Sequence, residues 1–235
     1  MGALIDSASA ILTQANERVE VSAQNIANLT TPGYKRRVAF KTVLSDRDQS
    51  LGTGSALATS PDLRPGKLIE TGVETDLALL GSGLFVVRQG DNILFTRQGQ
   101  FQRDPEGRLV TTTGAVLQAE GGGDIILGEG QLKVTSDGVL LQDERPVGRI
   151  AIAEFENAGV LTFADDGLLK APEAEPVTGK ATQVRQGALE ASNVSTADEM
   201  VAMMAALRRA EAAQRLVNVY DELMGRALST FGQSS

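Results

Sequence analysis

Apolar residues recur at helical spacing near the start of the 235-residue chain. Their positions alternate in steps of three and four, and they are Ile5, Ala8, Leu12, Ala15, Val19, Ser22, Ile26 and Leu29. This spacing is typical of a coiled-coil seam and predicts a helix over residues 3–30. Pro32 and Gly33 end the segment, because proline lacks the N–H that a helix needs and glycine favours a turn.

A second helical pattern occupies the end of the chain. Its apolar positions are Met200, Met203, Leu207, Ala210, Ala213, Val217, Tyr220, Met224, Ala227 and Phe231. Their mean spacing of about 3.4 residues is close to that of a supercoiled heptad and predicts a helix over residues 197–231. Thr196 and Glu199 form a capping box before it, and Gly232 is a stop signal. The methionines are expected to be adaptable core filler between helices.

Between these helices, short apolar runs alternate with turn signals. The runs are residues 84–87, 93–96, 109–111 and 139–141, with a longer strand expected from Val147 to Phe155. Such a series predicts an antiparallel sheet domain over residues 73–165. Gly81-Ser82-Gly83 is interpreted as the entry to a strand, because no helix follows it and no histidine is available to activate the serine.

The resulting prediction is an α+β chain whose terminal helices pair as a coiled-coil-like stalk. Its parts are an N-terminal coiled-coil helix (1–34), an extended connecting segment (35–72), a central β domain (73–165), a return connector (166–195) and a C-terminal coiled-coil helix (196–235). Helices of about 42 and 52 Å exceed the diameter of about 34 Å expected for the body. We therefore expect them to project and pair, with neighbouring subunits completing their burial.

Composition removes most familiar chemistry. The chain has no His, Cys or Trp, so the commonest general base, zinc ligand and thiol nucleophile are missing. Its net charge of −8 argues against nucleic-acid binding and against an anionic membrane surface. The first 22 residues lack the pattern of a cleavable signal peptide, and no apolar run is long enough for a membrane span. We expect no cofactor, no metal and no catalytic residues.

Two groups of charged residues offer alternatives. Acidic pairs occur at Asp104/Glu106, Asp143/Glu144, Glu154/Glu156, Asp165/Asp166 and Glu173/Glu175. Most adjoin Gly or Pro and are expected to be turn residues, but a hydrolase of cell-wall glycan could use Glu154 and Asp165. Lys35-Arg36-Arg37 is expected to form local ion pairs or packing contacts rather than a nucleic-acid site. A stand-alone binding module is a third alternative.

Three segments of the chain resemble the flagellar basal-body rod and hook proteins of bacteria. They are Asn25-Ile26-Ala27-Asn28-Leu29-Thr30-Thr31-Pro32-Gly33-Tyr34-Lys35, the stretch from Thr75 to Thr111 that includes Gly81-Ser82-Gly83-Leu84-Phe85 and Phe95-Thr96-Arg97-Gln98-Gly99, and Gln186-Gly187-Ala188-Leu189-Glu190-Ala191-Ser192-Asn193-Val194. Within that family, the short body and the last helix favour the proximal rod. Two parts of the connecting segment, Leu51-Gly52-Thr53-Gly54 and Thr71-Gly72, favour the distal-rod alternative.

The resemblance implies a non-enzymatic axial subunit of the basal-body rod in the periplasm. It implies export by the flagellar type III apparatus and assembly with other rod proteins and copies of itself. The terminal helices would line the tube, and the β domain would face outward. The assembly residues would be Ile5, Leu12, Val19, Ile26, Leu29, Met200, Met203, Leu207, Val217, Tyr220 and Met224, and the family motif would comprise Asn25, Ile26, Ala27, Asn28, Pro32, Gly33, Tyr34, Gly187, Leu189, Ser192, Asn193 and Val194.

Overall fold

The computed structural model describes residues 2–41, 57–155, 158–164, 167–171, 177–178 and 182–232. The chain divides into two compact units. The helix unit comprises Met1–Ile26, Ala39–Ala58 and Ser195–Ser235, and the β unit comprises Ala27–Val38 and Thr59–Val194. A helix at each end and a central antiparallel β region confirm the predicted α+β class.

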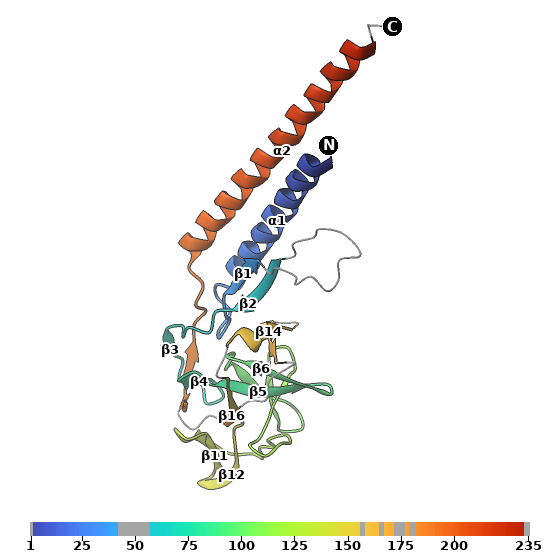
Figure 1. Cartoon of the computed structure of the whole chain (residues 1–235). Coiled ribbons are helices and arrows are strands. Elements are labelled where there is room, and N and C mark those ends of the chain that lie inside the picture. The colour runs from blue at the N-terminus through green and yellow to red at the C-terminus, as the bar shows by residue number, and fades with distance from the viewer. Residues whose placement is uncertain are drawn as a thin grey trace. The chain divides into compact units, whose positions relative to one another are not determined.

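Two helices make up most of the helix unit. Helix α1 (Gly2–Ala27) and helix α2 (Thr196–Gly232) lie side by side and run in opposite directions (Figure 1). Helix α1 ends at Ala27 rather than at residue 30, because the chain turns there and Thr31 N–H donates to Asn28 O at 3.2 Å. Over the described ranges, no helix combines the length and apolar character that a membrane crossing requires.

The start of α2 differs from the predicted capping box. Ser195, not Thr196, is the capping residue, since its Oγ accepts from Asp198 N–H at 3.4 Å and its carbonyl accepts from Glu199 N–H at 3.0 Å. Thr196 is already the first helical residue. The helix therefore begins with a serine cap one residue before the predicted position, and this cap is defined by the bond from the backbone N–H to the serine hydroxyl.

The β unit is built around one large sheet. Its strands are β5 (Leu84–Gln89), β6 (Asn92–Thr96), β7 (Phe101–Arg103), β8 (Leu109–Thr111), β9 (Val116–Leu117), β13 (Ile152–Glu154), β14 (Thr162–Phe163), β15 (Leu169–Lys170) and β16 (Val177–Thr178). The main order is β14-β15-β6-β5-β9-β8-β7, and β13 pairs with both β16 and β5. Strand β5 follows Gly81-Ser82-Gly83 directly, which confirms that this motif is a strand entry.

Apolar side chains cover both faces of the large sheet. Phe85 and Leu84 are neighbours on β5 and therefore point to opposite faces. Phe85 packs edge-on against Phe101 in the larger core, with ring centroids 5.4 Å apart. Leu84 belongs to a smaller core, in which Phe95 and Phe155 are 4.9 Å apart. Burial on both faces explains why β5 is a continuous apolar run rather than an alternating one.

A separate three-stranded sheet contains β10 (Leu132–Val134), β11 (Val139–Gln142) and β12 (Arg145–Arg149). Asp143 and Glu144 join β11 to β12 with φ values of 49° and 66°. These positive values match a tight hairpin turn and confirm a turn role for this acidic pair. The long strand predicted from Val147 to Phe155 is wrong, because β12 pairs with β11 whereas β13 pairs with β5. The chain leaves one sheet and enters another between them.

Short strand pairs occupy the two connecting regions. Strand β1 (Arg37–Lys41) pairs with β2 (Leu57–Pro61), and β3 (Leu68–Glu70) pairs with β18 (Ala188–Glu190). Strand β4 (Leu77–Leu80) pairs with β17 (Gln183–Gln186). A short 3-10 turn, η1 (Ala158–Val160), completes the elements. The described parts of residues 35–72 contain the short strands β1, β2 and β3, and Leu51-Gly52-Thr53-Gly54 lies outside the described residues.

Candidate functional site

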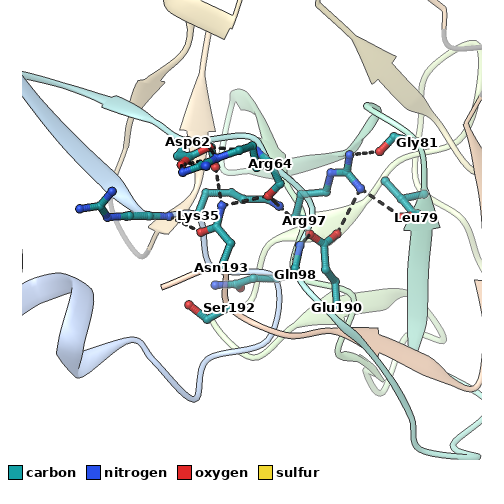
Figure 2. Close-up of polar contacts among 12 residues, drawn as sticks. Lys35, Asp62, Arg64, Leu79, Gly81, Arg97, Gln98, Glu190, Ser192 and Asn193 are labelled. Carbon is teal, nitrogen blue, oxygen red and sulfur yellow. Dashed lines mark hydrogen bonds and ion pairs between the residues drawn. The ribbon is translucent and has the colours of Figure 1, made fainter. Parts of the chain in front are cut away.

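Four segments of the β unit meet at one polar cluster, which we call the junction (Figure 2). They are residues 33–36, 62–66, 97–99 and 190–193, and they are linked by hydrogen bonds and ion pairs. The first and last of these segments carry parts of the sequence motifs that resemble the rod family. The chain therefore enters and leaves the β unit at the same place.

Glu190 is the centre of the junction. It ends β18 and is fully buried, yet both oxygens of its carboxylate have donors. Oε1 accepts from Lys35 Nζ at 2.5 Å and from Gly66 N–H at 2.8 Å, and Oε2 accepts from an Arg97 guanidinium nitrogen at 3.1 Å. The carbonyl of Glu190 also accepts from Gly33 N–H at 2.6 Å. One residue thus holds four segments of the chain together.

The two cations around Glu190 are buried as deeply as the carboxylate. Burial lowers the pKa of Lys35, and the nearby Glu190 carboxylate opposes that shift. Burial likewise lowers the pKa of Arg97, again against the effect of Glu190. Arg97 also donates to the carbonyls of Leu79 and Gly81, while its Nε has no hydrogen-bond partner among the described residues. The Glu190 carboxylate therefore offsets the desolvation free energy of both buried cations.

Asn193 joins the entering and leaving segments at a second point. Its side-chain oxygen accepts from Arg36 N–H at 2.8 Å. Its amide nitrogen donates to the carbonyls of Asp62 and Arg64, at 2.8 and 2.9 Å. Asp62 is itself paired with Arg64, whose hydrogen bonds lower the pKa of the Asp62 carboxyl. A single amide, which can both accept and donate, therefore connects three segments.

Glycines allow the backbones at the junction to approach closely. Gly33 has φ +70°, and a Cβ there would lie 2.2 Å from the carbonyl oxygen of Arg97. A Cβ at Gly66 would lie 1.9 Å from Ala191 O, and one at Gly99 would lie 1.6 Å from Leu77 O. Any side chain at these positions would force backbone atoms apart. Glycine is thus required by space at all three positions and, at Gly33, by conformation as well.

We predict that Gly33→Ala lowers the free energy of unfolding by at least about 2 kcal/mol, because it adds a clash with the Arg97 carbonyl to an unfavourable positive φ. Urea denaturation followed by circular dichroism measures the loss. Gly90→Ala is the matched control, since Gly90 also has positive φ (+59°) but its Cβ would meet nothing within 4 Å. Equal losses in the two variants would show that the close approach at Gly33 carries no extra cost.

The predicted motif residues fall into several environments. Gly33, Tyr34 and Asn193 lie at the junction, and Tyr34 is buried. Gly187, with φ +72°, forms the turn between β17 and β18, while Leu189 and Val194 are buried beside the junction. Ser192 Oγ accepts from Val194 N–H, and Asn28 accepts from Thr31. Asn25 is buried and Ile26 half-buried on α1, Ala27 is exposed, and Pro32 is half-buried.

Lys35 and Arg37 confirm the local role that was predicted for the basic cluster. Lys35 forms the buried ion pair with Glu190. The guanidinium of Arg37 lies 4.0 Å from the centre of the Phe163 ring, which is a cation–π contact.

The sequence interpretation missed Glu190 and Arg97 as site residues. A charged residue inside the apolar run Ala188-Leu189-Glu190-Ala191 was the signal that could have found Glu190.

Burial along α1 follows the predicted seam. Ala8, Ala15 and Ser22 are buried at steps of seven residues, and Leu12, Val19 and Ile26 are half-buried between them. Ile5 is 41% exposed and Leu29 lies beyond the end of the helix. The buried positions nearest the seam centre are therefore small residues, which permit close approach of a neighbouring backbone.

Burial along α2 is shifted by one residue over its first half. The buried and half-buried positions alternate in steps of four and three, and they are Glu199, Met203, Ala206, Ala210, Ala213, Val217, Tyr220 and Met224. Met200 and Leu207, which were placed in the seam, are 53% and 47% exposed. Met204 is exposed too, so these methionines are not filler within the chain. The side chains of Ala227 and Phe231 lie outside the described set.

An apolar groove lies where the start of α1 meets the second half of α2. Its walls are formed by Ile5, Ala8, Leu216, Val217, Val219, Tyr220 and Leu223. Ala8 is buried at its floor, whereas Leu216, Val219 and Leu223 are largely exposed along its rim. The two helices thus present an apolar surface that no described segment of the chain covers.

The remaining acidic residues serve the fold. Asp104 pairs with Arg108 at 2.7 Å and its carbonyl accepts from Gly107 N–H, which confirms the predicted turn. Glu154 accepts from the Thr182 hydroxyl at 2.6 Å. Asp165, the second carboxylate of the hydrolase alternative, lies outside the described residues. No group of three carboxylates that could hold a metal occurs within the described ranges. The described contacts of Asp104 and Glu154 are thus hydrogen bonds and an ion pair within the fold.

The comparisons with known proteins agree with this class. Family models match residues 78–171 ("Flagellar hook protein FlgE/F/G D1 domain") and 185–230 ("Flagellar basal body rod FlgEFG protein C-terminal"). The chain is 31% identical to the flagellar basal-body rod protein FlgF of Caulobacter vibrioides, over 92% of both chains. It is 28% identical to FlgF of Escherichia coli over 95% of this chain and 96% of that one, and 29% identical to FlgG of Bacillus subtilis over 88% and 90%. The chain belongs to the flagellar basal-body rod and hook protein family.

Proposed function

We propose that this chain is an axial subunit of the flagellar basal-body rod that assembles, through its terminal helices, with other rod proteins and with copies of itself. As a member of its family, it is a structural component of the flagellar basal body. One observation carries the proposal about the helices. Helix α2 exposes apolar side chains outside its buried seam, namely Met200, Val201, Met204, Leu207, Leu216, Val219 and Leu223. Such surfaces mark interaction sites.

The internal seams support pairing of the two helices as a coiled-coil-like stalk. On α1 and on the first half of α2, residues at seven-residue steps are buried, and most of them are small. Small seam residues favour close helix packing over a bulky interface. The exposed apolar positions of α2 would then contact neighbouring subunits. Contacts of this kind, made head to tail and without closure, give helical tubes.

The remaining parts of the proposal follow from the family resemblance. The terminal helices would line the tube, the acidic β unit would face outward, and the flagellar type III apparatus would export the chain. Similarity to FlgF favours the proximal rod, while similarity to FlgG keeps the distal rod and the hook as alternatives. Electron cryo-microscopy of isolated basal bodies, with a tag in the hairpin between β11 and β12, locates the subunit and decides between these positions.

We predict that Leu207→Asp abolishes incorporation into the rod and motility but leaves the isolated chain folded. Leu207 is 47% exposed, so the aspartate stays solvated in the monomer and becomes unfavourable only when a neighbouring subunit covers it. Swimming in soft agar and the composition of purified basal bodies measure the effect.

Asn218→Asp is the matched control for Leu207→Asp. Asn218 is exposed on the same side of α2, about 20° from Leu207 around the helix axis at 100° per residue. Its replacement by aspartate introduces the same charge. We expect it to preserve motility, because this side of the helix is polar beyond Leu207. Motile cells that carry Leu207→Asp in their rods would refute the role of Leu207 in contacts between subunits.

A further inference from the structure

The entering and leaving segments of the β unit run parallel where they touch. Gly33 N–H donates to Glu190 O, and Arg36 N–H donates to Asn193 Oδ1. Residue numbers increase in the same direction along both segments, and both pairs are separated by 157 positions (190 − 33 and 193 − 36). Two parallel segments that are pulled from opposite ends are loaded in shear.

The connectivity of the chain supplies that loading. Helix α1 precedes residue 33, and helix α2 follows residue 193. A force that draws the two helices apart therefore pulls the start of one segment and the end of the other. In shear, all the contacts between the segments must fail together, whereas in peeling they would fail one at a time. Shear is the stronger geometry for the same number of bonds.

Buried ion pairs reinforce the contact between the entering and leaving segments. Lys35 lies between Gly33 and Arg36, which make the two contacts above, and it forms an ion pair with Glu190 in which both side chains are almost fully buried. The same carboxylate binds Arg97, and Asn193 binds the carbonyls of Asp62 and Arg64. The segments are therefore fixed to each other and to the sheet beneath them (Figure 2).

We propose that residues 33–36 and 190–193 form a mechanical clamp that carries load directly between the two ends of the chain. The clamp bypasses residues 37–189, so the part of the β unit between its two segments is not stretched when the ends of the chain are pulled. This role suits the rod subunit proposed above, but it is a property of the single chain. Its test needs no assembly, so failure of one proposal is distinguishable from failure of the other.

Single-molecule force spectroscopy on the full chain tests the clamp. The chain has no native cysteine, so handles attach cleanly through T30C and T196C, at two exposed positions. At constant force, we expect Glu190→Gln to raise the rupture rate by about tenfold or more, because it removes the charge that Lys35 and Arg97 share. D124N is the control. It weakens a pair with Arg88 that lies outside the clamp, and we expect a change of no more than about twofold.

A second pulling direction separates a clamp from general stabilisation. Handles at D91C and E129C, both exposed, load the large sheet without loading the clamp. In this direction Glu190→Gln is expected to change the rupture rate by no more than about threefold. An equal acceleration in both directions, or none in either, would overturn the proposal. If Glu190→Gln fails to fold, Asn193→Ala is measured in its place, with the same expected results, since it removes the link to Arg36.

Discussion

Replacing Glu190 by alanine is expected to lower the free energy of unfolding by about 3–5 kcal/mol, a large share of the stability of an ordinary domain. The side chains of Lys35, Arg97 and Glu190 are 3%, 1% and 2% exposed, so the variant leaves two buried cations without their counter-ion. Gly66 N–H loses its acceptor as well. Urea denaturation monitored by far-ultraviolet circular dichroism measures the change.

An exposed ion pair provides the control for this prediction. Glu70 and Arg185 also join distant parts of the chain, but their side chains are 75% and 48% exposed. Glu70→Ala is therefore expected to cost less than about 1 kcal/mol. If Glu190→Ala costs no more than Glu70→Ala, the buried cations are stabilised by something other than Glu190, and the account of the junction given above is incorrect.

The helices were predictable because their periodicity is local. Both were found within three residues of their ends, and the seam of α1 matches the observed burial. The seam of α2 was misplaced over its first half because large apolar residues were preferred to small ones. Met200 and Leu207 are more hydrophobic than Glu199 and Ala206, yet only the latter are buried. The two consecutive steps of three at Leu207, Ala210 and Ala213 were the sign, since a seam through Glu199 and Ala206 restores alternating steps of four and three.

The β unit was predictable in class but not in detail. Turn residues and apolar runs located β5, β6, β8 and β11, because hairpins are specified by nearby sequence. The division of Val147 to Phe155 into β12 and β13 depends on which distant strand each half meets. Strand β12 is mostly exposed and carries two arginines, whereas β13 is partly buried, but neither pattern identifies the partner strand. Sheet membership is a tertiary property.

The junction was the least predictable part of the molecule. Lys35 and Glu190 are 155 positions apart, so neither residue reveals the other in the sequence. Gly33 and Asn193 were recognised through the family resemblance. A resemblance indicates that these residue types matter at these positions, but it does not give the physical reason. The structure supplies that reason. Gly33 must pass close to the Arg97 carbonyl, and Asn193 must accept and donate at once.

The pairing proposed for the two helices predicts the second large effect. Ala206→Asp is expected to separate α2 from α1, because Ala206 is 1% exposed and an aspartate there buries an unpaired charge. Hydrogen exchange with mass spectrometry measures the result in both helices. We expect amide exchange in α1, which carries no substitution, to accelerate by about tenfold or more, since exchange reports the free energy of local opening. In cells, the same variant is expected to lose motility.

Ala205→Asp distinguishes helix pairing from a simple loss of helix propensity. Ala205 is the preceding residue and is exposed, so the same substitution has the same intrinsic cost for α2 but buries no charge. Exchange in α1 is expected to stay within about twofold of the unmodified chain. If Ala206→Asp accelerates exchange only within α2, the seam of α2 does not hold α1. The stalk would then have to form between subunits rather than within one.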